Sequence, residues 1–150
     1  MNEKIYIRVI ETHQLLDEYI IIHDVLIAST KGLLGFLRKI FKPIDFDLYV
    51  HKLTAISNNM KENLSKLEEI DNHNLQEKEL QLKKVLFLFI IDFQKTVEKL
   101  AEINQKLSRK ADGKAYSMNE YNKDMKEYHF LIVSYTVTGR QLNKIFKKQD

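Results

Sequence analysis

The chain has 150 residues, of which 44% are hydrophobic and 30% are charged, with a formal net charge of +3 at pH 7. This mixture excludes a disordered chain and indicates one domain, 1–150, with a sizeable core. One proline, four glycines and no cysteine exclude a turn-rich all-β fold, disulfides, thiolate zinc sites and cysteine nucleophiles. No apolar run approaches the roughly 20 residues of a membrane span, and a cytoplasmic location is expected.

The first predicted helix covers about 3–29, and its apolar residues fit two heptad frames. One frame consists of Ile5, Val9, Thr12, Leu16, Tyr19, His23 and Leu26. The other consists of Tyr6, Val9, His13, Leu16, Ile20, His23 and Ile27. Because both frames fit, the apolar face is broad, and wide burial of residues 19–28 is expected.

The next segment, 31–42, is basic and amphipathic. Its leucine, isoleucine and phenylalanine residues recur at helical spacing, and its cations fall away from that stripe. Gly32 and Gly35 near its start and Pro43 after its end separate it from the neighbouring helices. A short extra helix at about 32–42 is therefore expected.

The second long helix opens with Asp45 and Asp47, whose charges suit the positive end of a helix dipole. Its 3-4 spaced seam consists of Phe46, Tyr49, Leu53, Ile56, Met60, Asn63, Leu67 and Ile70. Asn63 is the only polar member. A buried asparagine in such a seam commonly fixes the register between helices.

The third long helix follows a short loop at 71–74, where Asn74 and Glu77 resemble a capping box. It runs to about Ala111, and Gly113 is expected to end it. Its seam consists of Leu82, Leu86, Phe89, Phe93, Thr96, Leu100, Ile103 and Leu107.

The centre of this third helix, 85–91, is apolar at every position. A helix with no polar face must be surrounded by other helices or by a partner chain. Phe87, Ile90 and Ile91 lie outside the seam and are candidates for an apolar partner-binding surface. Asp92 ends the stretch, and Lys95, one turn away, is its simplest partner.

The fourth long helix opens with a capping box formed by Ser117 and Glu120. Its seam consists of Met118, Tyr121, Met125, Tyr128, Ile132, Tyr135, Gly139, Leu142 and Phe146. Gly139 leaves room for a neighbouring backbone to come close.

Short loops make the second, third and fourth helices successive antiparallel neighbours. The expected fold is all-α: an antiparallel up-down-up-down four-helix bundle with the short extra amphipathic helix after the first helix. The first and third helices, with their apolar middles, are expected to pack together at the centre.

Motifs for chemistry are missing from the sequence. No glutamate has a histidine three residues on, as a di-metal bundle requires, and there is no Gly-x-x-x-x-Gly-Lys loop for phosphates. His13 with Asp17, and His23 with Asp24, could form acid–base or ligand pairs. We interpret each as a core histidine satisfied by a hydrogen bond, with its neighbouring acid in solvent. We therefore expect no catalytic residue, metal, cofactor or small-molecule substrate.

Arg8 and His13 are separated by four residues. This spacing resembles the arginine–histidine motif of HEPN-type ribonucleases, which are small helical domains that usually dimerise. The resemblance covers six residues and implies RNA cleavage by Arg8 and His13.

Basic residues are expected to gather at one pole of the bundle, where segment 31–42 meets the loop between the third and fourth helices. This pole consists of Lys31, Arg38, Lys39, Lys42, Arg109, Lys110 and Lys114. Such a surface could bind an anionic membrane, nucleic acid or an acidic protein, or its charges could simply be solvated.

The leading hypothesis is a non-enzymatic interaction protein: an adaptor, an inhibitor or immunity-type protein, or a small assembly subunit, with a protein partner or a second copy of itself. Excess apolar surface at the middles of the first and third helices favours a homodimer. Peripheral binding of an anionic surface through 31–42 is the alternative, and a HEPN-like ribonuclease is a further one.

Overall fold

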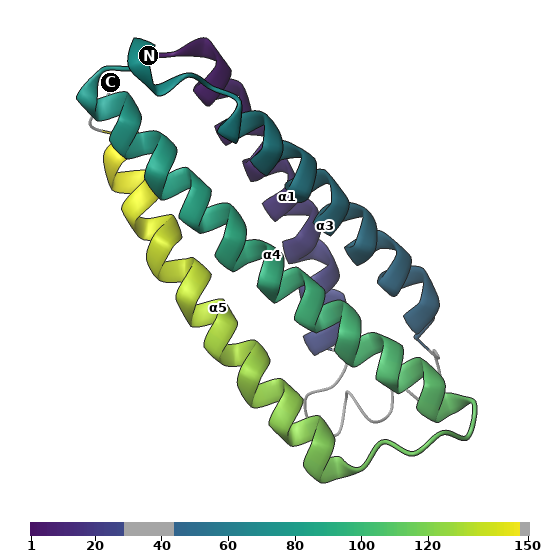
Figure 1. The fold of residues 1–150 in the computed structure, drawn as a ribbon. Coiled ribbons are helices and arrows are strands. Elements are labelled where there is room, and N and C mark those ends of the chain that lie inside the picture. Colours follow the sequence, from purple (N-terminus) through teal and green to yellow (C-terminus); the bar gives the residue numbers. More distant parts are fainter. Residues whose placement is uncertain (29–43, 148–150) are drawn as a thin grey trace.

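The computed structural model describes residues 1–28 and 44–147, which form an antiparallel helical bundle (Figure 1). Its long helices are α1 (Glu3–Ala28), α3 (Phe46–Glu68), α4 (Glu77–Ala111) and α5 (Met118–Phe146), and a short 3-10 helix, η1 (Asn72–Asn74), joins α3 to α4. The helices alternate in direction, which confirms the expected all-α four-helix bundle. The short helix expected at 32–42 lies outside the described residues.

The helix ends follow local capping chemistry. The Asp45 carboxylate accepts a hydrogen bond from the Leu48 backbone amide at 3.0 Å, and the Ser117–Glu120 capping box is confirmed. Gly113 has a positive φ of 88°, which suits its place after the end of α4.

The capping box expected at Asn74 and Glu77 is wrong. Asn74 belongs to η1, where its side-chain amide donates to Asp71 at 3.1 Å. Helix α4 starts later, and the Gln76 backbone amide donates to the Glu79 carboxylate at 2.9 Å. The loop therefore uses its asparagines for a tight turn of its own.

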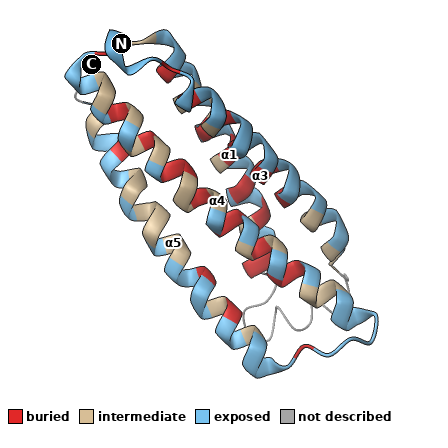
Figure 2. Cartoon of the chain, in the orientation of Figure 1, coloured by how far each residue is buried: buried red, intermediate tan, exposed pale blue. Residues whose placement is uncertain are grey.

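Helix α4 is the centre of the bundle and packs on both α3 and α5 (Figures 1 and 2). The predicted α4 seam is buried from Leu82 to Ile103. Helix α1 packs mainly on α3 and more sparsely on α4. The expected central pairing of α1 with α4 is therefore a minor contact, because heptad spacing identifies a buried face without identifying its neighbour.

The first heptad frame of α1 is confirmed in part. Its members Ile5, Thr12, Tyr19 and Leu26 are buried. Val9, Leu16 and His23 are half-buried, whereas Leu15 and Ile22, which belong to neither predicted heptad frame of α1, are buried.

The wide burial expected for 19–28 is wrong, because Ile21 is 67% exposed and Ile20 and Val25 are also exposed. Among the described residues, the helices that pack on α1 lie on its inner side, so one face of its apolar half is exposed.

Asn63 links α3 to α1, as its place in the seam suggested. Its amide nitrogen donates to the Thr12 hydroxyl at 2.7 Å and to the Arg8 carbonyl at 3.1 Å. The Arg8 guanidinium donates to the Asn63 amide oxygen at 3.2 Å. Only one register satisfies all these groups in a buried position, so Asn63 fixes how α1 sits on α3.

Gly139 permits the close approach that its position suggested, although the neighbour is a side chain. A Cβ atom added at Gly139 would lie 3.0 Å from the Phe89 ring. Phe89 also lies near Phe93 and Tyr135, with ring centroids 5.8 and 6.2 Å away. Gly139 therefore allows α5 to pack closely on the aromatic part of the α4 seam.

Candidate functional site

The apolar candidate surface on α4 is mostly inside the bundle. Ile90 is fully buried, so its assignment to a partner-binding surface is wrong. Phe87 and Ile91 are half-buried, and Leu88 is the exposed member of the stretch, at 52%. The physical reason is that α3 and α5 both lie on α4 and cover most of its circumference.

Phe87 and Leu88 line a shallow groove of about 490 Å³ beside η1, together with Leu80 and the stem of Lys84. Lys83 closes one end, where its ammonium donates to the Ile70 carbonyl at 2.6 Å. Lys83 and Lys84 border the groove, and Leu88 is its one exposed large apolar side chain. The groove is therefore a weaker candidate for docking than the outer face of α5 described below.

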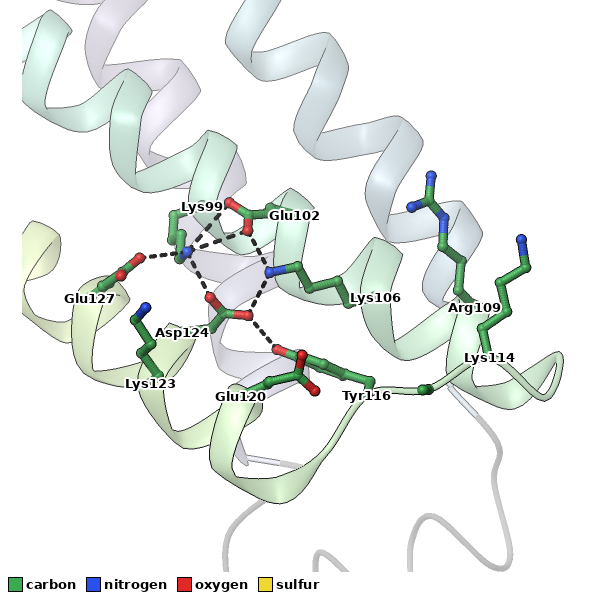
Figure 3. Close-up of a pocket in the computed structure, with 11 residues that line it drawn as sticks. Lys99, Glu102, Lys106, Arg109, Lys114, Tyr116, Glu120, Lys123, Asp124 and Glu127 are labelled. Atoms are coloured by element: carbon green, nitrogen blue, oxygen red, sulfur yellow. Dashed lines mark hydrogen bonds and ion pairs between the residues drawn. The ribbon is translucent and has the colours of Figure 1, made fainter.

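The basic pole is described only in part. Lys31, Arg38, Lys39 and Lys42 lie outside the described residues, while Arg109, Lys110 and Lys114 are exposed near the turn between α4 and α5. Arg109 and Lys114 line a groove of about 530 Å³ between the ends of these helices (Figure 3). The structure therefore brings two of the predicted cations to one groove.

A buried carboxylate, Asp124, organises the floor of this groove. It accepts hydrogen bonds from Lys99 at 2.9 Å, Lys106 at 2.8 Å and the Tyr116 hydroxyl at 2.7 Å (Figure 3). Lys99 also pairs with Glu127 at 2.7 Å. These bonds join α4, α5 and the turn between them, because Tyr116 lies in that turn.

The pKa values of this cluster follow from the same contacts. Burial raises the pKa of Asp124, but hydrogen bonds from Lys106, Lys99 and Tyr116 outweigh it and hold that pKa well below its usual range. Burial lowers the pKa of Lys99, but its bonds to Glu127 and Asp124 raise it above its ordinary value. At neutral pH Asp124 is therefore a carboxylate and Lys99 an ammonium, and their opposite charges offset each other.

The groove as a whole carries little net charge. Four carboxylates line it together with five cations, and the two deepest lysines are committed to Asp124. Arg109, Lys114 and Lys123 stand at the rim, and no described residue forms an ion pair with them. This arrangement suits a structural clamp better than a strong anion site.

The polar residues considered for chemistry have separate structural partners. Arg8 pairs with Glu11 at 2.6 Å and bonds Asn63, whereas His13 pairs with Asp17 at 3.2 Å on the surface. The structure thus gives Arg8 and His13 different partners. Because His13 is exposed, the expectation of a core histidine is wrong at this position.

The expected pairing of Asp92 with Lys95 is also not what the structure shows. The Asp92 carboxylate accepts from the Ser134 and Thr138 hydroxyls of α5, at 3.2 and 3.4 Å. This partner set depends on how α5 is rotated against α4.

A buried chain of polar side chains connects α1 to α5. The Tyr19 and Tyr128 hydroxyls lie 2.5 Å apart, and His23 Nδ1 lies 2.6 Å from the Tyr128 hydroxyl. Burial raises the pKa of both tyrosines, so both remain protonated at any physiological pH. Two tyrosines predicted as seam members thus satisfy each other's hydroxyls inside the core.

The outer face of α5 is the surface that the sequence reasoning missed. Phe130 is 74% exposed, Val133 61% and Val137 49%. Two rows of side chains, each with a seven-residue repeat, run along this face. They are Lys123, Phe130, Val137 and Lys144, and Lys126, Val133 and Arg140. Both rows have apolar residues in the middle and cations at the ends; we call these seven residues the α5 outer face.

The signal for this face was present in the sequence. Phe130, Val133 and Val137 are apolar residues of the fourth helix that lie outside its tyrosine-containing seam. All three acids of α5 are used elsewhere: Asp124 and Glu127 pair with Lys99, and Glu120 caps the helix start. The four cations of the α5 outer face have no ion-pair partner among the described residues.

No group of three or more potential metal ligands comes together within 1–28 and 44–147. In the same part of the chain, no helix is both long and apolar enough to cross a membrane.

No known protein family, curated protein or solved structure shows a significant match to this chain.

Proposed function

We propose that this chain is a non-enzymatic helical-bundle protein that acts by binding another protein chain, and that the α5 outer face is its binding surface. The observation that carries the proposal is the exposure of Phe130, Val133 and Val137 in one continuous stripe. Apolar side chains scattered singly on a surface need no explanation, whereas a contiguous stripe marks an interaction site.

The composition of the α5 outer face also supports a protein partner. Its centre is an aromatic residue flanked by valines, and its ends are unpaired cations. A protein interface commonly has an apolar, aromatic centre and a polar rim. The polar clusters elsewhere support the same view, since Asp124 and Asn63 each find their partners within the bundle.

Peripheral binding of an anionic surface through the basic pole has weaker support. Its described members, Arg109, Lys110 and Lys114, are exposed. The groove beside them also holds Glu102, Glu120, Asp124 and Glu127, which offset much of the positive potential. The absence of cysteine is compatible with a cytoplasmic location, which stays a prediction.

The test is site-specific photo-crosslinking in cells that naturally produce this chain. A photoreactive amino acid replaces Val133 on the α5 outer face, and a matched control replaces the exposed Asn58 on α3. We expect Val133 to give a cross-linked product of defined mass, and the control to give none. If the variant with the photoreactive residue at position 133 gives no cross-linked product, or if both positions give the same products, the proposal is contradicted.

Vesicles provide the comparison with a membrane surface, because an exposed aromatic between lysines also suits anionic lipid. The purified chain is sedimented with phosphatidylserine vesicles and with neutral vesicles. We expect it to stay in the supernatant in both cases. Sedimentation with the anionic vesicles that is lost in a Phe130→Ser, Val133→Ser variant would overturn the proposal of a protein partner.

A further inference from the structure

We infer that the partner of the α5 outer face is the α1 helix of a second copy of this chain, so that two copies pair with α1 of each lying on α5 of the other. This inference rests on the proposed function and names the partner. It is carried by the opposite charges of two apolar outer faces on the neighbouring helices α1 and α5.

The outer face of α1 is apolar and acidic. Its exposed apolar residues Ile7, Ile10, Ile21 and Val25 point away from the buried Ile5–Thr12–Tyr19–Leu26 seam. Asp17 and Asp24 stand on the same side, one heptad apart, and both are exposed. We call these six residues the α1 outer face.

The charge on the two helices is opposite. Helix α1 carries five acids and two bases. Of the bases, Arg8 is held by Glu11 and Asn63. Helix α5 carries four bases and three acids, and its acids are held by Lys99 or by the helix cap. The charges left for a partner are therefore mostly negative on α1 and positive on α5.

Helices α1 and α5 are neighbours in the bundle. They run antiparallel beside each other, since Tyr6 stacks on Phe146 at 6.0 Å and Tyr19 lies 6.2 Å from Tyr135. Tyr128 contacts both Tyr19 and His23. Ile21, midway between the last two, therefore lies within about one helical turn of the level of Phe130.

These positions give each copy two complementary strips on neighbouring helices. A two-fold axis brings the α1 strip of one copy onto the α5 strip of the other, and the same contact forms twice. Ile21 then lies near the level of Phe130, Asp24 lies near the level of Lys126, and Asp17 lies between the levels of Lys126 and Arg140. A closed pair uses both strips of both copies, so it leaves neither exposed.

Charge reversal tests this pairing. The α1-reversed variant carries Asp17→Lys and Asp24→Lys, and the α5-reversed variant carries Lys126→Glu and Arg140→Glu. The control carries Lys52→Glu and Lys95→Glu, two exposed lysines on α3 and α4. All six positions are on helix surfaces, and circular dichroism melting verifies that each variant folds.

Sedimentation equilibrium of the purified proteins measures the result. We expect the wild-type chain and the control to form dimers, and each reversed variant alone to have a dissociation constant raised at least about tenfold, because like charges then meet. Mixed in equal amounts, the two reversed variants should again form a dimer with near wild-type affinity, since each α1 then meets an α5 of opposite charge.

The outcomes separate this inference from the proposed function. A wild-type chain that stays monomeric, reversed variants that dimerise like the control, or a mixture that does not recover dimerisation would overturn the inference. A photo-crosslink from Val133 to a different protein, together with a monomeric purified chain, would overturn the inference and leave the proposed function standing. Oligomers larger than a dimer would overturn the closed two-fold arrangement.

Discussion

Helices α3 and α5 both pack along α4, yet they use their apolar residues differently (Figure 2). Helix α3 buries six residues and exposes one large apolar side chain, Leu48. Helix α5 buries three residues and exposes Met118, Phe130, Val133 and Val137. Both helices pack on α4. Helix α3 therefore shows that a helix can pack on α4 while exposing little apolar surface.

The difference indicates that the stripe on α5 is not required by the bundle. The inner side of α5 is held by specific contacts: Asp124 with two lysines, Tyr128 with Tyr19, and Gly139 beneath Phe89. Its outer side adds apolar area that the fold leaves in water. Two roles are thus separated on one helix, and substitutions on each side should have different effects.

The largest expected effect is at the α1–α3 seam. Replacing Asn63 with alanine removes its bonds to Thr12 and Arg8 and leaves a cavity, so the free energy of unfolding should fall by about 2–3 kcal/mol. Urea unfolding followed by circular dichroism measures the change. The exposed Asn59→Ala on the same helix is the control, with an expected change within about 0.5 kcal/mol. Equal effects at the two positions would show that the seam does not depend on Asn63.

A smaller effect is expected at the α4–α5 clamp. Asp124→Asn leaves Lys99 and Lys106 without their shared carboxylate and should lower the free energy of unfolding by about 2 kcal/mol at pH 7. The comparison that isolates this effect is Asp112→Asn, at an exposed aspartate in the turn after α4.

The pH dependence of this difference follows from the lowered pKa of Asp124 in the folded state. An unfolded aspartate titrates near about pH 3.9. The stabilisation by the Asp124 carboxylate is therefore complete above that pH and is lost as the pH falls below it, toward the folded pKa. We expect the free energies of unfolding of the wild type and of Asp124→Asn to converge as the pH is lowered below about 4. A gap that stays constant down to acid pH would contradict the role of the charged form.

The smallest effect on stability is expected on the α5 outer face. Phe130→Ser with Val133→Ser should change the free energy of unfolding by no more than about 0.5 kcal/mol under conditions where the chain is monomeric. Leu142→Ser, on the buried side of the same helix, should cost about 3 kcal/mol. A loss of several kcal/mol from the outer pair would mean that the stripe belongs to the core after all.

The parts of the fold that sequence could predict are those set by local periodicity. The spacing of Leu82, Leu86, Phe89 and Phe93 identifies the buried face of α4 correctly, and Ser117 marks the start of α5. Such features depend on residues within one helix. Asn63 was also predictable as a register-fixing residue, since it interrupts an otherwise apolar seam.

The features that sequence could not predict depend on how one helix is turned toward another. Asp92 bonds hydroxyls on α5 in place of the nearby Lys95 because α5 presents them there. Ile90 is enclosed and Phe130 is exposed, although both lie in apolar stretches, because α4 is covered on two sides and α5 is not. The Asp124 cluster was missed for the same reason, since it assembles residues from α4, α5 and their turn.

The central claim is that the α5 outer face is a binding surface and that its partner is a second copy of the chain. The most direct test is the molar mass of the unmodified protein by light scattering over a range of concentrations. We expect the mass to rise from 17.8 kDa toward twice that value, and the Phe130→Ser, Val133→Ser variant to stay at 17.8 kDa. A wild-type mass of 17.8 kDa at every concentration, or a variant that dimerises as the wild type does, would contradict the claim.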